Sequence, residues 1–211
     1  IYLGGPQLVQ AATGEIVDNI VHDNQQIGIY AYQSATIVGN RVYNQRNTAG
    51  TAIGVYADSV ELRGNVIYSN DVGVEGAGGR DTTLIVENRL FDNGVGVLTR
   101  FGSATIARNQ IYSNSLGLRL GVSNSSTQVS PSASNNLLYD NSNGGVRVEA
   151  GFDVELVNNT IVQTVGDAIR IEGMSRGTRL VNNVLWVEAG YAISVAANSQ
   201  EEFHSDYNQF L

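Results

Sequence analysis

Cysteine is absent from the 211 residues of this chain, and proline occurs only twice. The absence of cysteine excludes disulfide bonds and thiolate metal sites. No stretch approaches the roughly 18 uninterrupted apolar residues that a transmembrane helix requires, so we expect no membrane insertion. Glycine, asparagine, valine and isoleucine are abundant instead. This composition is typical of many short strands joined by tight turns, rather than of long helices.

Charge is also sparse, since charged residues make up 15% of the chain, and the formal net charge is −8. No run of lysine or arginine occurs anywhere along the sequence. Nucleic-acid backbones and anionic membrane surfaces attract basic proteins, so the sequence predicts neither as a partner. The simplest interpretation of the charge is an acidic, solvated surface.

An asparagine recurs at intervals of 21 to 27 residues along the chain. The repeated positions are Asn19, Asn40, Asn65, Asn88, Asn109, Asn136, Asn159, Asn183 and Asn208. Periods of this length are typical of solenoids, in which each unit buries its apolar face only against its neighbours. We therefore divide the chain into coils that begin at these asparagines.

Each coil carries apolar residues at three fixed positions, which predicts three short strands per coil. One position lies two residues after the asparagine, another follows a glycine or alanine, and the third lies three residues before the next asparagine. In one coil these residues are Leu138, Val146 and Leu156. Alternation of apolar and polar residues is typical of strands, so the apolar columns are expected to point inward. No segment offers a crossover helix of about ten residues, which disfavours a βαβ architecture.

Two further columns accompany the apolar ones. The residue that follows the first inward position is usually aromatic and is expected to point outward: His22, Tyr43, Tyr68, Phe91, Tyr112, Tyr139 and Trp186. A second polar column is predicted at Asn24, Asn44, Asn70, Asn93, Asn114 and Asn141, replaced by Thr164 and Glu188 in later coils. Stacked asparagines can hydrogen-bond from coil to coil, which predicts an asparagine ladder.

The coil pattern N-x-[I/L/V]-[Y/F]-x-N, followed by G-[V/I]-x-[V/I], resembles the repeats of the pectate-lyase-like superfamily over essentially the whole chain. This resemblance implies an all-β, right-handed parallel β-helix of about eight coils. The superfamily includes polysaccharide lyases, hydrolases, epimerases, phage tailspikes and non-enzymatic bacterial surface proteins, and the chain looks most like the last group. The resemblance is specific for the fold and leaves the activity open.

Residues 1–211 are expected to form a single β-helix domain that is a segment of a longer chain, because neither end carries an atypical polar cap. The open ends are expected to pair with neighbouring protein chains. Residues 121–135, in the longest interval, contain no charged residue and are rich in serine. We predict that they form a polar loop that protrudes from the coil.

Three arginines occupy the same outward position in successive coils: Arg119, Arg147 and Arg170. Like charges at about 5 Å repel unless they are compensated, and Glu149 and Glu172, two residues further along their strands, are well placed to compensate them. One interpretation is a surface ion-pair network of small net value. The other is a patch that binds carboxylated or sulfated sugars through bidentate arginine contacts. The aromatic column is another candidate sugar surface.

The resemblance to pectate lyases implies a chemistry in which an arginine acts as base and carboxylates bind calcium. Arg147 or Arg170 beside Glu149 and Glu172 superficially matches that set, but calcium prefers about six to eight oxygen ligands. A hydrolase needs a close pair of acids, and the aspartates of the later coils are scattered over different turn positions. The epimerase-type Asp-Pro-His-Asp motif is absent, as is any recognisable Ser/His/Asp set.

The sequence therefore favours a structural or adhesive β-helix module of an exported or cell-surface bacterial protein, extracellular and in contact with glycans. A carbohydrate-active enzyme, similar to a polysaccharide lyase and using the arginine and glutamate face, is the alternative. We predict no catalytic residue, no metal site and no cofactor, with calcium needed only under the lyase alternative. The predicted partners are a polysaccharide, or neighbouring protein chains at the open ends of the solenoid.

Overall fold

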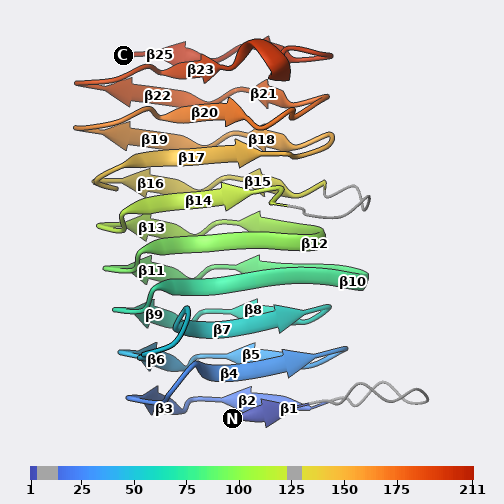
Figure 1. Ribbon diagram of the computed structural model, residues 1–211, viewed down its shortest axis with the longest axis vertical. Coiled ribbons are helices and arrows are strands. Elements are labelled where there is room, and N and C mark those ends of the chain that lie inside the picture. Colours follow the sequence, from blue (N-terminus) through green and yellow to red (C-terminus); the bar gives the residue numbers. More distant parts are fainter. Residues whose placement is uncertain (4–13, 123–129) are drawn as a thin grey trace.

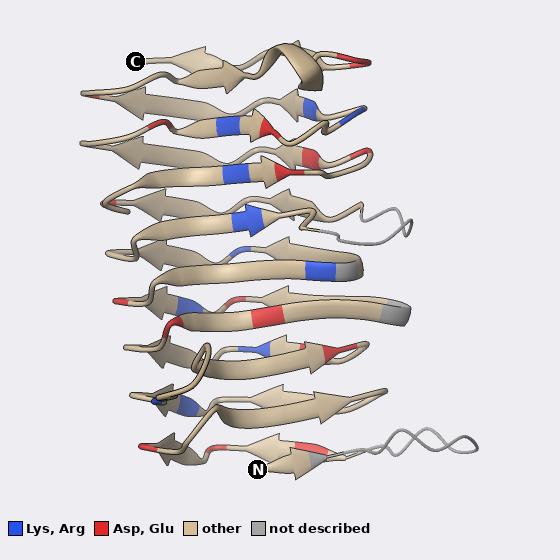
Figure 2. Cartoon of the chain, viewed as in Figure 1, with Lys and Arg blue, Asp and Glu red and all other residues tan. Residues whose placement is uncertain are grey.

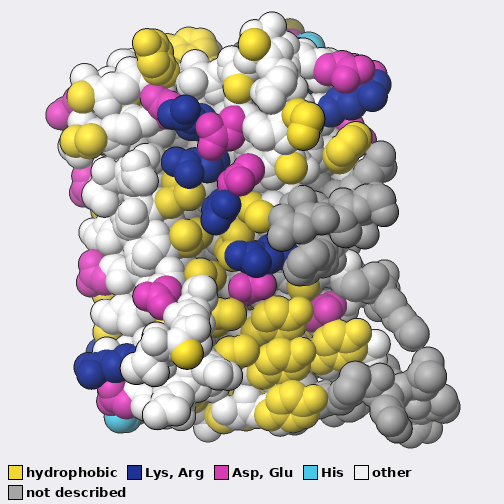
Figure 3. Space-filling view, in the orientation of Figure 1, with side chains coloured by type: hydrophobic (Ala, Val, Ile, Leu, Met, Phe, Trp, Pro, Cys, Tyr) yellow, Lys and Arg dark blue, Asp and Glu magenta, His cyan; other side chains and the backbone are white. Residues whose placement is uncertain are grey.

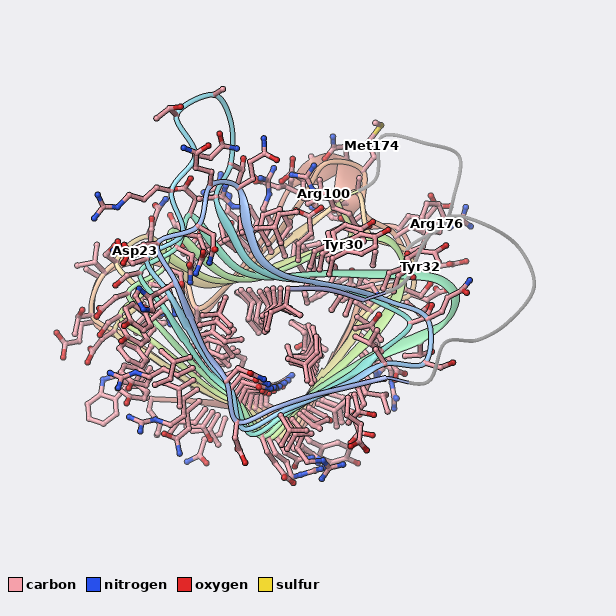
Figure 4. The ribbon with its side chains drawn as sticks, turned by 90° about the horizontal axis from the view of Figure 1, so that it is seen from below. Asp23, Tyr30, Tyr32, Arg100, Met174 and Arg176 are labelled. Carbon is pink, nitrogen blue, oxygen red and sulfur yellow. The ribbon has the colours of Figure 1, made fainter. Side chains whose placement is uncertain are left out.

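The computed structural model describes residues 1–3, 14–122 and 130–211, without the side chains of residues 79–81 and 101. The chain winds into a right-handed parallel β-helix of about eight coils stacked along one axis (Figure 1). Its cross-section is triangular, and each side of the triangle is a column of parallel strands (Figure 4). This is the fold that the repeat predicts.

The first column contains the longest strands, and its outer surface is called here the long-strand face. Its members are β1 (Tyr2–Leu3), β4 (Ile27–Tyr32), β7 (Ile53–Asp58), β10 (Val72–Val86), β12 (Val95–Ala107), β14 (Leu116–Leu120), β17 (Gly144–Glu149), β20 (Ile169–Glu172) and β23 (Ile193–Val195). β10 and β12 continue around the corner without a break and pair within the second column as well.

The second column is built from three-residue strands that pair with one another from coil to coil. The bent ends of β10 and β12 fill the two coils between β8 and β15. Its separate members are β2 (Glu15–Val17), β5 (Thr36–Val38), β8 (Glu61–Arg63), β15 (Ser132–Ser134), β18 (Glu155–Val157), β21 (Arg179–Val181) and β24 (His204–Asp206). Because of β10 and β12, the first two columns form one continuous sheet.

The third column is a separate sheet of nine strands. They are β3 (Ile20–His22), β6 (Arg41–Tyr43), β9 (Val66–Tyr68), β11 (Arg89–Phe91), β13 (Gln110–Tyr112), β16 (Leu137–Tyr139), β19 (Thr160–Gln163), β22 (Val184–Val187) and β25 (Gln209–Phe210). In the described part of the chain the only helical turn is η1 (Ala197–Ser199), and no helix there is long and apolar enough to cross a membrane.

The corner between the second and third columns explains the recurring asparagine. The residue before each repeated asparagine has a positive φ, from 52° at Tyr207 to 67° at Gly39, and these residues include Arg108 at 56°. Positive φ in residues other than glycine costs about 1–2 kcal/mol, so a compensating interaction must hold the corner. The buried side chain of the asparagine that follows supplies it.

Asn109 shows how this first ladder works. Its Nδ2 donates to Asn136 Oδ1 at 3.0 Å and to the Ile85 carbonyl at 2.9 Å. Its Oδ1 accepts from the backbone N–H of Asn88 at 2.8 Å and from Asn88 Nδ2 at 3.1 Å. The same bonds run without a break from Asn19 to Asn208. The chain thus contains an asparagine ladder at this column, whereas the sequence predicted one only at the second asparagine column.

The second ladder differs from the sequence prediction in three coils, and in the last of them Val187, not Glu188, lies opposite Gln163. Gln45, not Asn44, occupies the ladder position, because strand register places Gln45 opposite Asn70 and its side chain is buried. In a later coil Gln163 is buried instead of Thr164, yet neither atom of its side-chain amide has a hydrogen-bond partner among the described residues. The ladder therefore ends at Asn141.

Glycine at the start of the long strands from β4 to β17 makes room for this second ladder. A Cβ atom on Gly117 would lie 2.5 Å from the Gly145 carbonyl oxygen and 3.2 Å from Asn141 Nδ2. Where the ladder has ended, the equivalent residue is Ala168. The glycine column and the amide column are thus two parts of one packing arrangement.

The three predicted apolar columns fill the interior. Leu138, Val146 and Leu156 are each at most 2% exposed, as are most residues in their columns. Phe210 continues the register opposite Leu185 but is 57% exposed, because β25 pairs with β22 alone. The inward assignment is therefore confirmed except at this residue.

The predicted loop over residues 121–135 needs correction at its C-terminal end. Ser132–Ser134 form β15, which pairs with β12 and β18, and Ala133 is buried as its column predicts. Residues 123–129 lie outside the described residues. The serine-rich composition concealed a short strand, because Ser132 and Ser134 lack the β-branched or aromatic side chains that are enriched in strands and only Ala133 is buried.

Candidate functional site

The long-strand face divides into an aromatic half and a charged half. Tyr30 stacks between Tyr2 and Tyr56 with ring centroids 5.2 and 4.7 Å apart. Figure 3 shows hydrophobic side chains gathered over this end of the face, with basic side chains in a column above them. Figure 4 places Tyr30, Tyr32 and Arg100 on the outer side of the same sheet.

The three arginines of the sequence prediction lie in register on β14, β17 and β20, one above another (Figure 2). The glutamates compensate them diagonally, as expected. Arg119 Nη2 lies 2.8 Å from Glu149 Oε2, and Arg147 Nε lies 3.5 Å from Glu172 Oε1. A second ion pair joins Arg170 Nε to Glu172 Oε2 at 2.8 Å, which raises the pKa of that guanidinium.

These ion pairs leave much of each guanidinium unused. The side chains of Arg119, Arg147 and Arg170 are 32%, 29% and 51% exposed. The Nε of Arg147 is buried without a hydrogen-bond partner among the described residues. A guanidinium has five N–H donors, so donors remain for a ligand at each arginine.

A cavity of about 150 Å³ opens beside two of these arginines. Arg147, Arg170 and Asp167 line it together with Gly144 and Gly166, whose missing side chains help to keep it open. Asp167 lies 3.7 Å from Arg170 Nη1 and accepts a hydrogen bond from the Tyr191 backbone N–H. Sequence reasoning did not select Asp167, because nothing along the chain indicates that it reaches the arginine column.

Glu75 is a largely buried carboxylate of the face, with a side chain 13% exposed. Burial raises its pKa, and Arg100, whose Nε lies 3.7 Å from Glu75 Oε1, opposes that rise. Burial, with nearby Asp58, also raises the pKa of Tyr56 to about 12. Glu75 holds on β10 the outward position that Tyr56 holds on β7 and Leu98 on β12, and sequence reasoning did not select it as a site residue.

The aromatic column on the third sheet is a continuous stack. Its ring centroids lie 4.8 to 5.2 Å apart from His22 to Tyr139, with nearly parallel planes. Arg41 lies over Tyr43 and Tyr68, and its Nε donates to the Tyr68 hydroxyl at 3.1 Å. Because the rings cover one another's faces, a sugar ring cannot stack on them, which favours a stabilising role for this column.

Metal binding finds little support on the described residues. No group of three or more histidine, aspartate and glutamate side chains comes together in the described ranges. Glu149 and Glu172 both contact arginines. A calcium ion prefers about six to eight oxygen ligands, so these two carboxylates do not fit the calcium site that a lyase resemblance implies.

The fold and its surface define a parallel β-solenoid with one long, charged sheet face. The chain belongs to the right-handed β-helix family, since the family model described as the right-handed beta helix region matches residues 36–185. No curated protein sequence matches the chain.

Several solved structures are similar to the chain. The periplasmic alginate epimerase AlgG is 17% identical with a TM-score of 0.68, covering 94% of this chain and 50% of its own. The A-module of the mannuronan C-5 epimerase AlgE6 from Azotobacter vinelandii is 15% identical with a TM-score of 0.65, covering 92% of this chain and 58% of its own. XylC in complex with xylose is 17% identical with a TM-score of 0.51, covering 85% of this chain and 31% of its own. The chain thus spans about half the length of the two epimerases, and the likeness establishes the fold.

Proposed function

We propose that the chain is a carbohydrate-binding β-helix module of an exported or cell-surface bacterial protein, and that its long-strand face binds an anionic polysaccharide. The observation that carries the proposal is the register of Arg119, Arg147 and Arg170, one partly exposed arginine per coil. Coils repeat at about 4.8 Å, close to the advance per ring of an extended polysaccharide. Successive acidic sugars can therefore meet successive arginines.

The similar solved structures support this choice of ligand. Two of them are named for alginate and mannuronan, both acidic polysaccharides, and one of these is called periplasmic. Guanidinium groups already bonded to carboxylates can exchange them for ligand carboxylates at little net cost.

Binding of immobilised alginate tests the proposal, with the double substitution Arg147→Ala/Arg170→Ala compared with the wild type. Loss of two charge-assisted contacts should weaken binding by about tenfold or more. The matched control is Arg108→Ala/Arg179→Ala, two exposed arginines that pair with Glu87 and Glu155 away from this face. Equal binding by the wild type and the Arg147/Arg170 variant would reject the proposed surface.

A carbohydrate-active enzyme is the second candidate, and the cluster around Glu75 favours it. A buried carboxylate with a raised pKa is typical of acid–base catalysis, and here it lies beside Arg100 and Tyr56. Release of unsaturated or epimerised products from acidic polysaccharides, abolished by Glu75→Gln, would establish an enzyme. Binding without turnover, with and without added calcium, would establish the module.

A further inference from the structure

A second cavity, of about 410 Å³, lies far from Arg119, Arg147 and Arg170, in the coils of β3, β4, β6 and β7. The connection from β6 to β7 projects from the solenoid on the side of Asp23 and forms one wall (Figure 4). Asp23 and Gln25 contribute from the lower coil, and Arg46, Asn47 and Thr48 contribute from the upper one. Nearly every side chain on these walls carries a polar group.

The two charges of this cavity are held apart by an amide. Asn44 Nδ2 donates to Asp23 Oδ1, and Asn44 Oδ1 accepts from Arg46 Nε at 3.3 Å and from Arg46 Nη2 at 3.4 Å. The other carboxylate oxygen, Asp23 Oδ2, lies 2.7 Å from His22 Nδ1, and this contact lowers the pKa of Asp23. The cavity therefore contains one carboxylate and one guanidinium that are fixed in place without neutralising each other directly.

Both groups keep spare hydrogen-bonding capacity. A carboxylate has about four acceptor positions and a guanidinium has five donors, and these contacts use only some of each. Asn47 is locked by its own turn, since its Oδ1 accepts from the Ala49 backbone N–H at 3.0 Å and its Nδ2 reaches the Thr51 carbonyl at 3.3 Å. That turn holds Thr48 and Ala49 as a preformed rim of the cavity.

We infer that this cavity binds an uncharged sugar, as a site separate from the arginine column. Neighbouring sugar hydroxyls both donate and accept, so one can donate to Asp23 while the next accepts from Arg46. The paired charges sum to zero, which matches a neutral ligand, whereas an acidic sugar would place its carboxylate near that of Asp23. A preformed pocket with a few fixed polar groups is the usual form of a small-ligand site.

Titration calorimetry with neutral oligosaccharides of glucose, xylose and mannose, beside alginate oligosaccharides, tests this inference on the full chain. At least one neutral oligosaccharide should bind saturably. Asp23→Asn, which keeps the shape of the side chain and tolerates its positive φ, should weaken that binding by tenfold or more. Ala49→Trp, at the rim, should abolish it. Equal melting temperatures of the three proteins would show that both variants fold.

The control is Arg147→Ala/Arg170→Ala, which should bind the neutral sugar like the wild type while losing alginate. The experiment thus tests neutral-sugar binding at the cavity and alginate binding at the arginine column independently. Absence of saturable binding by every neutral oligosaccharide would overturn the inference. It would also be overturned if Asp23→Asn and Ala49→Trp bound as the wild type does, or if the cavity preferred alginate or a zwitterion such as glycine.

Discussion

At the scale of single residues, each ladder asparagine contributes several hydrogen bonds to the free energy of unfolding. Asn109 satisfies the polar groups of three coils at once, so its loss leaves several buried donors and acceptors without partners. We expect Asn109→Ala to lower the free energy of unfolding by about 3–5 kcal/mol. Denaturant unfolding measures this. The adjacent, exposed Gln110→Ala should change it by less than about 0.5 kcal/mol, and equal effects would contradict the ladder's role.

Gln163 is the opposite case, because its buried side-chain amide contributes no hydrogen bond to the stability of the fold. It is fully buried and its side-chain nitrogen and oxygen find no partner among the described residues. Gln163→Met keeps the volume and removes both polar groups, so the free energy of unfolding should rise by about 1–3 kcal/mol. A decrease in thermal or denaturant stability would show that the amide is bonded in solution, by water or by another group.

Glu75 should make stability depend on pH in an unusual direction for a carboxylate. Because burial raises its pKa, the folded protein holds the proton more tightly than the unfolded chain. The resulting stabilisation is present at acid pH and is lost as the pH rises through the folded pKa. The melting temperature of Glu75→Gln, relative to the wild type, should therefore be higher at pH 7 than at pH 4.

Glu87 provides the control of opposite sign. A hydrogen bond from Arg108 lowers the pKa of Glu87, so its stabilising contribution is lost as the pH falls. Relative to the wild type, Glu87→Gln should thus be less stable at pH 7 than at pH 3. If both variants shifted in the same direction with pH, the assignment of Glu75 as a buried carboxylate would be wrong.

At the scale of the strand, the alternation of inward and outward side chains decides which substitutions reduce stability. Leu138 is fully buried in β16, and its neighbour Leu137 is 40% exposed. Leu138→Asp places a charge in the core and should unfold the neighbouring coils, whereas Leu137→Asp should cost less than about 1 kcal/mol. Circular dichroism and thermal melting distinguish the two. Cooperative folding retained by Leu138→Asp would contradict the inward assignment.

The same alternation explains how much of the fold the sequence predicts. Period and alternation place Leu138, Val146 and Leu156 correctly, because each coil repeats the same local pattern. The pattern misplaced Asn44, Thr164 and Glu188, since ladder membership depends on register with the next coil rather than on residue type. Strand length was also beyond local reasoning, because β10 and β12 bend around a corner where other coils turn.

The candidate surface was predicted only in part, for a related reason. The sequence places Arg119, Arg147 and Arg170 in one column because they share a position in the repeat. Glu75 pairs with Arg100 of the next coil, and Asp167 accepts a hydrogen bond from Tyr191 of the next coil, contacts that no periodic pattern reveals. Likewise, the second cavity depends on a turn between strands, where the repeat carries no information.

At the scale of the whole molecule, stability should be transmitted only between neighbouring coils. Ile111 and Leu138 are direct partners in the third sheet, whereas Val42 and Leu185 lie many coils apart. Alanine substitutions at Val42 and Leu185 should be additive within about 0.5 kcal/mol, and those at Ile111 and Leu138 should show a coupling of about 0.5–3 kcal/mol. Denaturant unfolding of both double-mutant cycles measures this. Strong coupling in the distant pair would indicate a globally connected core.

The corner, with its residue of positive φ followed by a ladder asparagine, recurs in every coil and bonds each coil to the next through the same atoms. A molecule built in this way has approximate translational symmetry along its axis, and its corner geometry sets no fixed number of coils. Duplication or loss of one whole period in the gene leaves every corner with an equivalent neighbour. Under the proposed function, selection can lengthen or shorten the long-strand face one coil at a time, and so adjust avidity for a long polymer.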